Sequence, residues 1–231
     1  MECLYVPELD TESSIVVLPD DEARHARVLR MREGEACLLS NGRGICAEAV
    51  VQRVARNEIV CRVLRTIPQY AEHPYRIVVA LGILAQRERL EFAVEKAVEL
   101  GAHDFVPLLT EYSQSTHIKA ERLQSKARAA MKQAHRSCLT TIHDPISLQG
   151  LFSMLPAEAR IIVADAQGIQ PQSYSAHTIC ICVGSEGGWS PEEYRYMQHD
   201  PRVIFWKLAP SRLRAETAVV SGISTATLFH T

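Results

Sequence analysis

The feature that most constrains this chain is a change in its hydrophobic rhythm near residue 70. Beyond that point, apolar strand-like runs alternate with helical segments, and the runs are "YRIVVALGIL", "DFVPLL", "RIIVAD", "TICICVG" and "RVIFWKL". The helical segments lie at about 87–101, 119–136, 147–155, 191–199 and 216–229. This alternation predicts an α/β domain with a mostly parallel sheet that is covered by helices on both faces.

The first 70 residues have a different pattern, with short strand-like runs separated by turns. The runs are "SIVVL", "EACLLS", "CAEAVVQRV" and "EIVCRVL", and "NGRG" at 41–44 is a typical hairpin turn. A small β-barrel fits this pattern, with a short helix capped by Asp20 or Asp21. The Pro-containing stretch 68–75 predicts a linker, and therefore two domains at 1–70 and 75–231.

Composition excludes several classes of protein. A chain of 231 residues with 47% hydrophobic and 23% charged residues is typical of soluble globular proteins. Because no apolar run approaches ~20 residues and the amino terminus lacks a signal pattern, we expect a cytoplasmic protein without a membrane span. The seven cysteines lie mostly in apolar runs, which indicates reduced thiols. The absence of CxxC, HxH and HxxxH spacing predicts no metal site.

Two basic segments have alternative interpretations. Five arginines fall within twenty residues of the first domain: Arg24, Arg27, Arg30, Arg32 and Arg43. They form either a solvated charged turn or a patch for phosphates. On the expected helix 119–136, six bases share one side against a single acid, Glu121: Lys119, Arg122, Lys126, Arg128, Lys132 and Arg136. This side is either a solvated face or a polyanion-binding surface in a chain whose net charge is −2.

The loop "VGSEGGWSPEE" at 183–193 is the first candidate ligand site. Its glycines leave backbone groups bare, and Ser190, Pro191 and Glu193 form a typical helix start. The loop lacks the Walker lysine and the GxGxxG fingerprint, so it is either a tight turn or a site for another flat ligand. A second loop, "APSRLRAETA", follows the next strand. Ligands bind beyond the carboxyl ends of parallel strands, so the two loops predict one pocket built from two sides.

Together these motifs resemble the RsmE family of the SPOUT superfamily, which methylates uridine N3 in small-subunit ribosomal RNA. "GSEGGWSPEE" is similar to the family's GPEGG loop, "LAPSRLRAETA" at 208–218 to its LGxRILRxETA segment, and "EKAVELGAHDFVP" to its KATELG helix end. "QAHR" at 133–136 matches the QSxR of its basic helix, and "YVPEL", "HARVLRMREGE" and "NGRG" match its barrel. The resemblance therefore covers nearly the whole chain.

The sequence departs from the family pattern at a few positions. Ser185 replaces the usual proline, Ala209 the usual glycine, and Leu213 follows Arg212 where the family has an Ile-Leu pair. Gln86 stands where lysine is common, and Thr140 where proline is expected. Ala209 matters most, because its Cβ lies in a loop expected to meet the ligand.

The resemblance implies a PUA-like RNA-binding barrel and a SPOUT domain whose C-terminal trefoil knot holds S-adenosyl-L-methionine. It implies that the knot brings the loops 164–168, 184–188 and 208–214 together. The residues expected to bind the cofactor are Ala164, Gly184, Glu186, Gly187, Gly188, Leu208, Ala209 and Leu213. The residues expected to bind RNA phosphates are Arg27, Arg30, Arg32, Arg128 and Lys132. A homodimer acting on small-subunit rRNA, in the ribosomal subunit, is also implied.

The expected chemistry needs stabilised charge more than a nucleophilic side chain. Uridine N3 reacts only after losing its proton, and Arg214 or Arg136 is expected to stabilise the charge on the uracil oxygens. Glu216 is either the proton acceptor or a salt-bridge partner of Arg214 at the helix start. The alternatives are a SPOUT enzyme that methylates a ribose 2′-OH or another base, and a non-catalytic RNA-binding assembly factor. A dinucleotide-dependent oxidoreductase fits poorly without its fingerprint.

Overall fold

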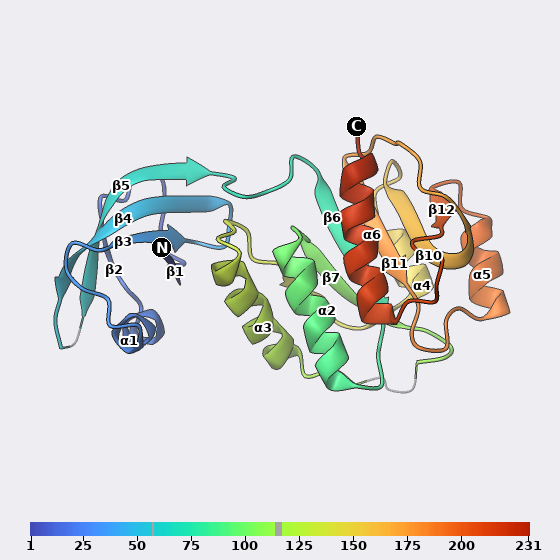
Figure 1. Cartoon of the computed structure of the whole chain (residues 1–231), viewed down its shortest axis with the longest axis horizontal. Coiled ribbons are helices and arrows are strands. Elements are labelled where there is room, and N and C mark those ends of the chain that lie inside the picture. Colours follow the sequence, from blue (N-terminus) through green and yellow to red (C-terminus); the bar gives the residue numbers. More distant parts are fainter. Residues whose placement is uncertain (57, 114–116) are drawn as a thin grey trace. The chain divides into compact units, whose positions relative to one another are not determined.

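A computed structural model describes residues 1–56, 58–113 and 117–231. The chain forms two compact units (Figure 1). Unit 1 consists of Met1–Glu72 and Arg128–Leu139, and unit 2 of His73–Ala127 and Thr140–Thr231. The first boundary lies inside the linker expected at 68–75. The segment 128–139 differs from the expected division, because it groups with the N-terminal unit although it follows the linker by more than fifty residues.

Unit 1 is built on a five-stranded sheet with the strand order β1-β3-β4-β5-β2. The strands are β1 (Glu2–Tyr5), β2 (Ile15–Val17), β3 (Ala36–Ser40), β4 (Ile45–Val54) and β5 (Ile59–Pro68). All four strand-like runs of the sequence form strands, and β1 adds a parallel partner for β3. Two register shifts between β4 and β5 bend the sheet around a core that includes Leu39, Ala47 and Ile59.

The two turns expected in unit 1 have different outcomes. "NGRG" links the antiparallel strands β3 and β4 as predicted, and Asn41 Oδ1 accepts hydrogen bonds from the backbone N–H groups of Arg43 (2.7 Å) and Ile45 (3.1 Å). The cap of helix α1 (Asp20–Val28) was predicted wrongly. The helix begins after Pro19 without a side-chain cap, so both aspartates lie inside its first turn, where their charge favours the positive end of the helix dipole.

Unit 2 contains a parallel sheet with the order β12-β10-β11-β6-β7-β8, in which β9 also pairs with β7. The long strands are β6 (Arg76–Gly82), β7 (Asp104–Leu109), β10 (Arg160–Ile169), β11 (Thr178–Val183) and β12 (Val203–Trp206). They correspond to the five apolar runs of the sequence, and all the pairings described in this sheet are parallel, where a mostly parallel sheet was expected. The short strands β8 (Thr141–Ile142) and β9 (Ile146–Ser147) had no sequence signal.

Helices cover both faces of this sheet (Figure 1). They are α2 (Arg87–Glu99), α4 (Leu148–Met154), α5 (Pro191–Gln198) and α6 (Ala215–Phe229), while α3 (Ala120–Gln133) spans the boundary between the two units. Phe152 of α4 and Met197 of α5 are buried with inward residues of the sheet such as Ile161. Helix α6 packs on β11 and against α2. The approach is close because α6 presents Gly222 to the strand, where a Cβ would lie 2.7 Å from Ile181 Cγ2.

The predicted helix ends of unit 2 are confirmed where the chain has a clear signal. Ser190 and Glu193 form a reciprocal capping box at the start of α5, with Pro191 in its first turn. Gly101 has φ +92° just beyond α2, a conformation that favours glycine after a helix. Helix α5 therefore begins directly after the glycine loop, which fixes where that loop ends.

All seven cysteines are free thiols, and all but Cys138 are buried. Burial raises the pKa of Cys3 to about 12 and that of Cys46 to about 11. Among the described residues, no helix combines the length and the apolar character that crossing a membrane requires. The described residues also contain no cluster of three or more His, Cys, Asp or Glu side chains arranged to hold a metal ion.

Candidate active site

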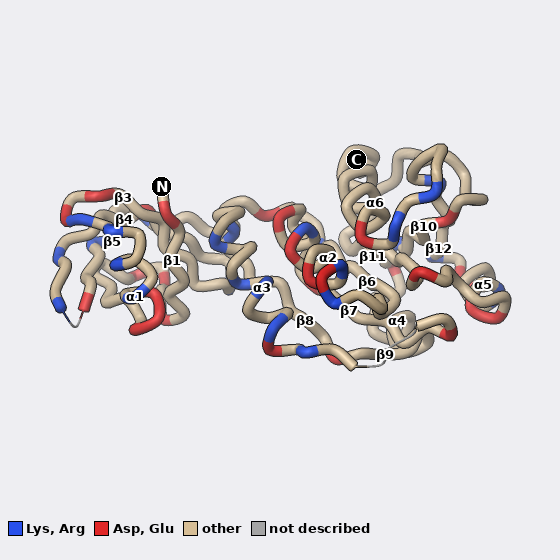
Figure 2. Tube along the Cα trace, turned by 60° about the horizontal axis from the view of Figure 1, so that its bottom comes forward, with Lys and Arg blue, Asp and Glu red and all other residues tan. Residues whose placement is uncertain are grey.

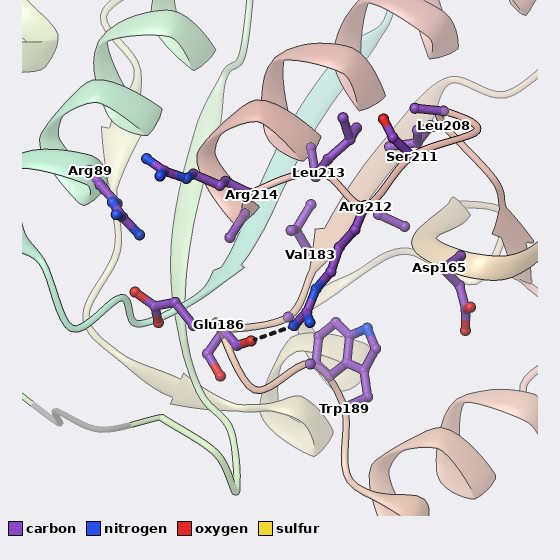
Figure 3. Close-up of a pocket in the computed structure, with 18 residues that line it drawn as sticks. Arg89, Asp165, Val183, Glu186, Trp189, Leu208, Ser211, Arg212, Leu213 and Arg214 are labelled. Carbon is purple, nitrogen blue, oxygen red and sulfur yellow. Dashed lines mark hydrogen bonds between the residues drawn. The ribbon is translucent and has the colours of Figure 1, made fainter.

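A cavity of about 440 Å³ lies at the carboxyl ends of β10, β11 and β12 (Figure 3). It is lined by residues 164–166, 183–186, 188–189, 208–209, 211–215 and 218, together with Arg89 of α2. The three strand-end segments are far apart in sequence, and the parallel sheet brings them to one edge. The volume is typical of pockets for small molecules and cofactors, which span about 300–1,000 Å³.

The glycine loop forms one wall of this cavity through a tight turn. Gly188 N donates to Ser185 O at 2.9 Å, and Gly188 has φ +76°. A Cβ on Gly188 would meet no atom within 4 Å, so the bare backbone borders open space on the cavity wall. Behind the loop, a Cβ on Gly82 would lie 2.4 Å from Ser185 N, so β6 must present glycine there. These glycines therefore both shape the loop and leave room beside it.

Polar contacts hold the loop in place. Glu186 accepts hydrogen bonds from Ala85 N at 3.2 and 3.4 Å, and Arg212 Nη2 donates to Glu186 O at 3.3 Å (Figure 3). The side chain of Ser185 is buried, and Thr110 Oγ1 donates to its hydroxyl at 3.4 Å. The serine that replaces the family's proline therefore has a local partner. Arg212 joins the two loops that the sequence placed on opposite sides of the pocket.

The centre and right of the cavity, as seen in Figure 3, are lined mainly by apolar side chains. Val183, Trp189, Leu208 and Leu213 line this part, with Asp165 at its edge. Trp189 Nε1 is buried and has no hydrogen-bond partner among the described residues. Apolar walls with a few polar groups at defined positions are typical of sites that bind an organic cofactor. A buried donor without a partner can donate a hydrogen bond to an acceptor of a ligand.

The other side of the cavity carries charge. Arg89 and Arg214 lie there with Glu186 in Figure 3. Arg214 is the residue that precedes the first turn of α6, and Arg89 reaches the cavity from the first turn of α2. Arg89 Nε lies 3.7 Å from Glu216 Oε1, and Glu216 is only 8% exposed. Within the described part of the chain, no ion pair joins Glu216 to Arg214, so the pairing expected at this helix start involves a different arginine.

Most of the residues predicted to bind the cofactor line the cavity. These are Ala164, Gly184, Glu186, Gly188, Leu208, Ala209 and Leu213. Gly187 does not, because it faces away from the cavity: a Cβ there would lie 2.6 Å from Tyr112 Cβ. Of the residues predicted to be catalytic, Arg214 lines the cavity, whereas Glu216 and Arg136 do not.

Arg136 belongs to unit 1, where it is 2% exposed. Its guanidinium Nε donates to Glu72 Oε2 at 3.2 Å, and its Nη2 forms a second, shorter bond to the same oxygen. The other carboxylate oxygen of Glu72 accepts from Cys138 N (2.8 Å) and Ser137 Oγ (3.3 Å). This is the arrangement of a structural ion pair. It fixes the segment after α3 to the end of the first strand-rich segment of unit 1.

The bases on and after α3 mostly have acidic partners. Arg122 pairs with Glu91 and Lys126 with Glu95, both on α2, where Figure 2 shows acidic and basic positions together. Lys132 Nζ lies 2.7 Å from the buried Glu22, and Arg128 lies 3.9 Å from Asp21 and stacks over the Tyr5 ring. In contrast, Arg30 and Arg32 are exposed, and Arg27 donates to Ala55 O.

Sequence reasoning singled out neither Arg89 nor Trp189, and it included Asp165 only as part of the 164–168 loop. Arg89 lies more than a hundred residues before the second loop. The sequence pattern around it indicated only a helix that packs its apolar side on the core. Trp189 lies inside the loop 183–193, and its position as an aromatic residue between a glycine turn and a helix start is the sequence signal that could have identified it.

Two further departures from the family pattern can be located in the structure. Thr140 is buried and donates to Ala102 O at 2.6 Å, and Gln86 precedes α2 without a side-chain cap.

The fold and the cavity define a class: an α/β protein with a parallel sheet, a cofactor-sized pocket at the carboxyl ends of its strands, and a separate β-rich unit. The RNA methyltransferase domain model matches residues 71–227, and the RNA methyltransferase PUA domain model matches residues 18–64. The chain therefore belongs to the RNA methyltransferase family, with an N-terminal PUA-like domain and a SPOUT-type methyltransferase domain.

Relatives confirm the resemblance to the RsmE family. Ribosomal RNA small subunit methyltransferase E of Bacillus subtilis is 26% identical, over 92% of this chain and 90% of the relative. The protein of the same name from Mycobacterium bovis is 28% identical, over 93% of this chain and 86% of the relative. The Neisseria gonorrhoeae enzyme of that name, solved bound to S-adenosyl methionine, superposes with a TM-score of 0.88 at 25% identity, covering 99% of this chain and 98% of its own. A probable rRNA-methyltransferase from Porphyromonas gingivalis gives 0.84 at 31% identity, covering 99% and 98%.

Proposed function

We propose that this protein is an S-adenosyl-L-methionine-dependent methyltransferase that acts on N3 of a uridine in small-subunit (16S) rRNA. The observation that carries the proposal is the cavity itself. Two motif-bearing loops and the end of β10 converge on one pocket that has an apolar side, a bare glycine backbone and a charged side. The family membership and the relatives named for small-subunit rRNA methylation support the same function.

The residues on the apolar side fit the cofactor. Leu208 and Leu213 offer contact area for an adenine ring, and the open space beside Gly188 admits a ligand against the backbone. Trp189 Nε1 and Asp165 add a donor and an acceptor at the wall. Ala209 lines the cavity too, so the extra methyl group is accommodated in its outline. When bound, the cofactor supplies an electrophilic methyl group on a sulfonium centre.

The protein's main chemical task is then to stabilise the deprotonated uracil. Loss of the N3 proton leaves negative charge on N3, O2 and O4, and a guanidinium preorganised beside these atoms lowers the barrier. Arg214 lines the cavity and fits this role. Glu216 lies outside the cavity lining and pairs with Arg89, so it fits a positioning role better than that of a proton acceptor. Arg136, in its buried pair with Glu72, fits a structural role.

RNA binding is proposed for the PUA-like unit, chiefly through Arg27, Arg30 and Arg32. Arg128 contributes less, because it already pairs with Asp21 and stacks over the Tyr5 ring. A flexible or unstacked target base would enter the cavity of unit 2.

We also propose a trefoil knot formed by the loops around the cavity, a homodimer, and action on the ribosomal subunit in the cytoplasm. The family resemblance supports these four points. Sedimentation analysis tests the dimer.

Mass spectrometry of small-subunit rRNA nucleosides tests the proposed function. Cells without this protein should lack one N3-methyluridine, and the purified protein with S-adenosyl-L-methionine should restore it. Loss of a 2′-O-methyl group or of another methylated base would replace the proposal with a different specificity. An unchanged set of modified nucleosides, with rRNA binding retained, would favour a non-catalytic assembly factor.

A further inference from the structure

The charged side of the cavity holds the guanidinium groups of Arg89 and Arg214, and the proposed cofactor contacts on the apolar side use neither of them. We propose that Arg89 is a second base-binding residue, and that Arg89 and Arg214 together receive the uracil ring by its two carbonyl oxygens. This inference rests on the proposed function, and it assigns the substrate subsite within the same cavity.

Arg89 is held for this task by contacts within unit 2. It comes from the first turn of α2, which is separate in sequence from the strand-end loops that carry the motifs, and it lies on the same side of the cavity as Arg214 and Glu186 (Figure 3). Its side chain is 27% exposed, so it lies at the rim of the cavity rather than on the open surface. Glu216 Oε1, 3.7 Å from Arg89 Nε, lies behind it and is mostly buried. Because Glu216 is two residues after Arg214 in α6, one helix start positions both guanidinium groups.

The charged side chains in and beside the cavity balance, three arginines against three carboxylates, so what distinguishes the guanidinium groups is which of them already have partners. The cavity lining contains the guanidinium groups of Arg89, Arg212 and Arg214 and the carboxylates of Asp165 and Glu186. Arg212 already donates to a backbone oxygen of the glycine loop, and Glu186 already accepts from Ala85 N. Glu216 partly neutralises Arg89 from outside the lining. Arg214 has no hydrogen bond or ion pair from its side chain within the described residues, which leaves its donors for a ligand.

Two guanidinium groups match the chemistry of N3 methylation. N3 of uracil lies between O2 and O4, and both oxygens share the charge when the N3 proton is released to solvent. The N3 lone pair then forms the new N–C bond while the S–C bond of the sulfonium breaks and sulfur keeps the electron pair. An arginine at each oxygen stabilises the anion on both sides of N3. Cytosine places a donor amino group at C4, which a guanidinium disfavours, so the pair also selects for uracil.

Single-turnover methylation tests the proposal. The substrate is small-subunit particles from cells lacking the protein, with labelled S-adenosyl-L-methionine at saturation, measured across a range of pH. Arg89→Ala should lower the rate by ~10²-fold or more near neutral pH. The deficit should shrink as pH rises, because the base then loses its proton without help. Cofactor affinity measured by calorimetry should stay unchanged. Arg89→Lys, which keeps the charge but not the planar fork, should recover part of the rate.

Arg87→Ala is the matched control, because Arg87 is an arginine of the same helix turn that pairs with Glu88 and Glu91 outside the cavity. A rate and pH profile for Arg89→Ala equal to those of Arg87→Ala would overturn the inference and leave the proposed function standing. Loss of cofactor binding in Arg89→Ala would also overturn it, by assigning Arg89 to the cofactor. A wild-type protein that forms no N3-methyluridine would refute the proposed function and the inference with it.

Discussion

Replacing Arg136 by methionine separates a structural role from the catalytic one that its sequence motif indicates. The substitution removes both guanidinium bonds to Glu72 and leaves a buried carboxylate, 0% exposed in its side chain, with the Cys138 N–H and the Ser137 hydroxyl as donors. Removing one partner of a buried ion pair costs about 3–5 kcal/mol, because the remaining charge is desolvated without compensation. We therefore expect a large loss of stability in unit 1.

Urea unfolding followed by circular dichroism measures this loss. With a slope of about 1–3 kcal/mol per molar urea, the midpoint should fall by at least about 1 M. Arg65→Met is the matched control, because Arg65 forms the same kind of bond to Glu48 on the exposed surface of the same unit. It should leave the midpoint nearly unchanged. The double variant Arg136→Met with Glu72→Gln should recover much of the loss, since the buried charge is then absent.

Methyl transfer supplies the refuting result. Arg136→Met, assayed at a temperature where it is folded, should retain the wild-type single-turnover rate, whereas a residue that touches the uracil would lose it. An unchanged urea midpoint combined with a rate reduced by ~10²-fold or more would refute the structural interpretation and return Arg136 to catalysis.

Three further predictions concern other parts of the molecule. Gly188→Ala should weaken S-adenosyl-L-methionine binding, measured by calorimetry, because the new methyl group occupies open cavity space and φ +76° is strained for alanine. Arg30→Ala combined with Arg32→Ala should weaken rRNA binding and lower its salt slope by about 2, measured by filter binding at several ionic strengths. The Arg202 guanidinium holds the pKa of the Asp200 carboxyl below its usual value. This depressed pKa stabilises the fold at neutral pH, and the contribution is lost as pH falls through it, so the unfolding free energy of Asp200→Asn should depend less on pH below about pH 4.

Each of these predictions has a control in the same chain. Gly34→Ala, at φ +89° in unit 1 with no atom within 4 Å of its added methyl group, should leave cofactor binding unchanged. Arg53→Ala with Arg195→Ala removes two exposed arginines that pair with Glu58 and Glu192, and should keep the salt slope. If either control matches its test variant, the corresponding assignment is wrong. An acid dependence of Asp200→Asn equal to that of the wild type would contradict the role of its pKa.

The strands and helix starts of unit 2 could be predicted from the sequence because their signals are local. Apolar runs such as "TICICVG" and the Ser190 capping box depend on near neighbours, and parallel pairing then places the loop ends at one edge. The roles of charged residues were harder to predict because their partners are distant in sequence. Arg136 meets Glu72 across 64 positions, and Arg89 meets Glu216 across more than a hundred. The orientation of Gly187 was hard to predict for a similar reason. It faces Tyr112 of another loop, and the periodicity of helices and strands does not indicate which loops pack together.

The ion pairs of α3 change where RNA affinity is expected to arise. In a chain of net charge −2, a basic helix face would be the obvious polyanion surface. Yet Arg122, Lys126, Arg128, Lys132 and Arg136 each lie within 4.0 Å of a carboxylate. A base that already has an acidic partner gains less from a phosphate, because that bond must be exchanged and the acid repels the RNA. Within the residues that the structure describes, no carboxylate pairs with the exposed arginines after α1, so they carry no such cost. Electrostatic attraction to rRNA should therefore depend more on Arg30 and Arg32 than on the helix with the greater number of bases.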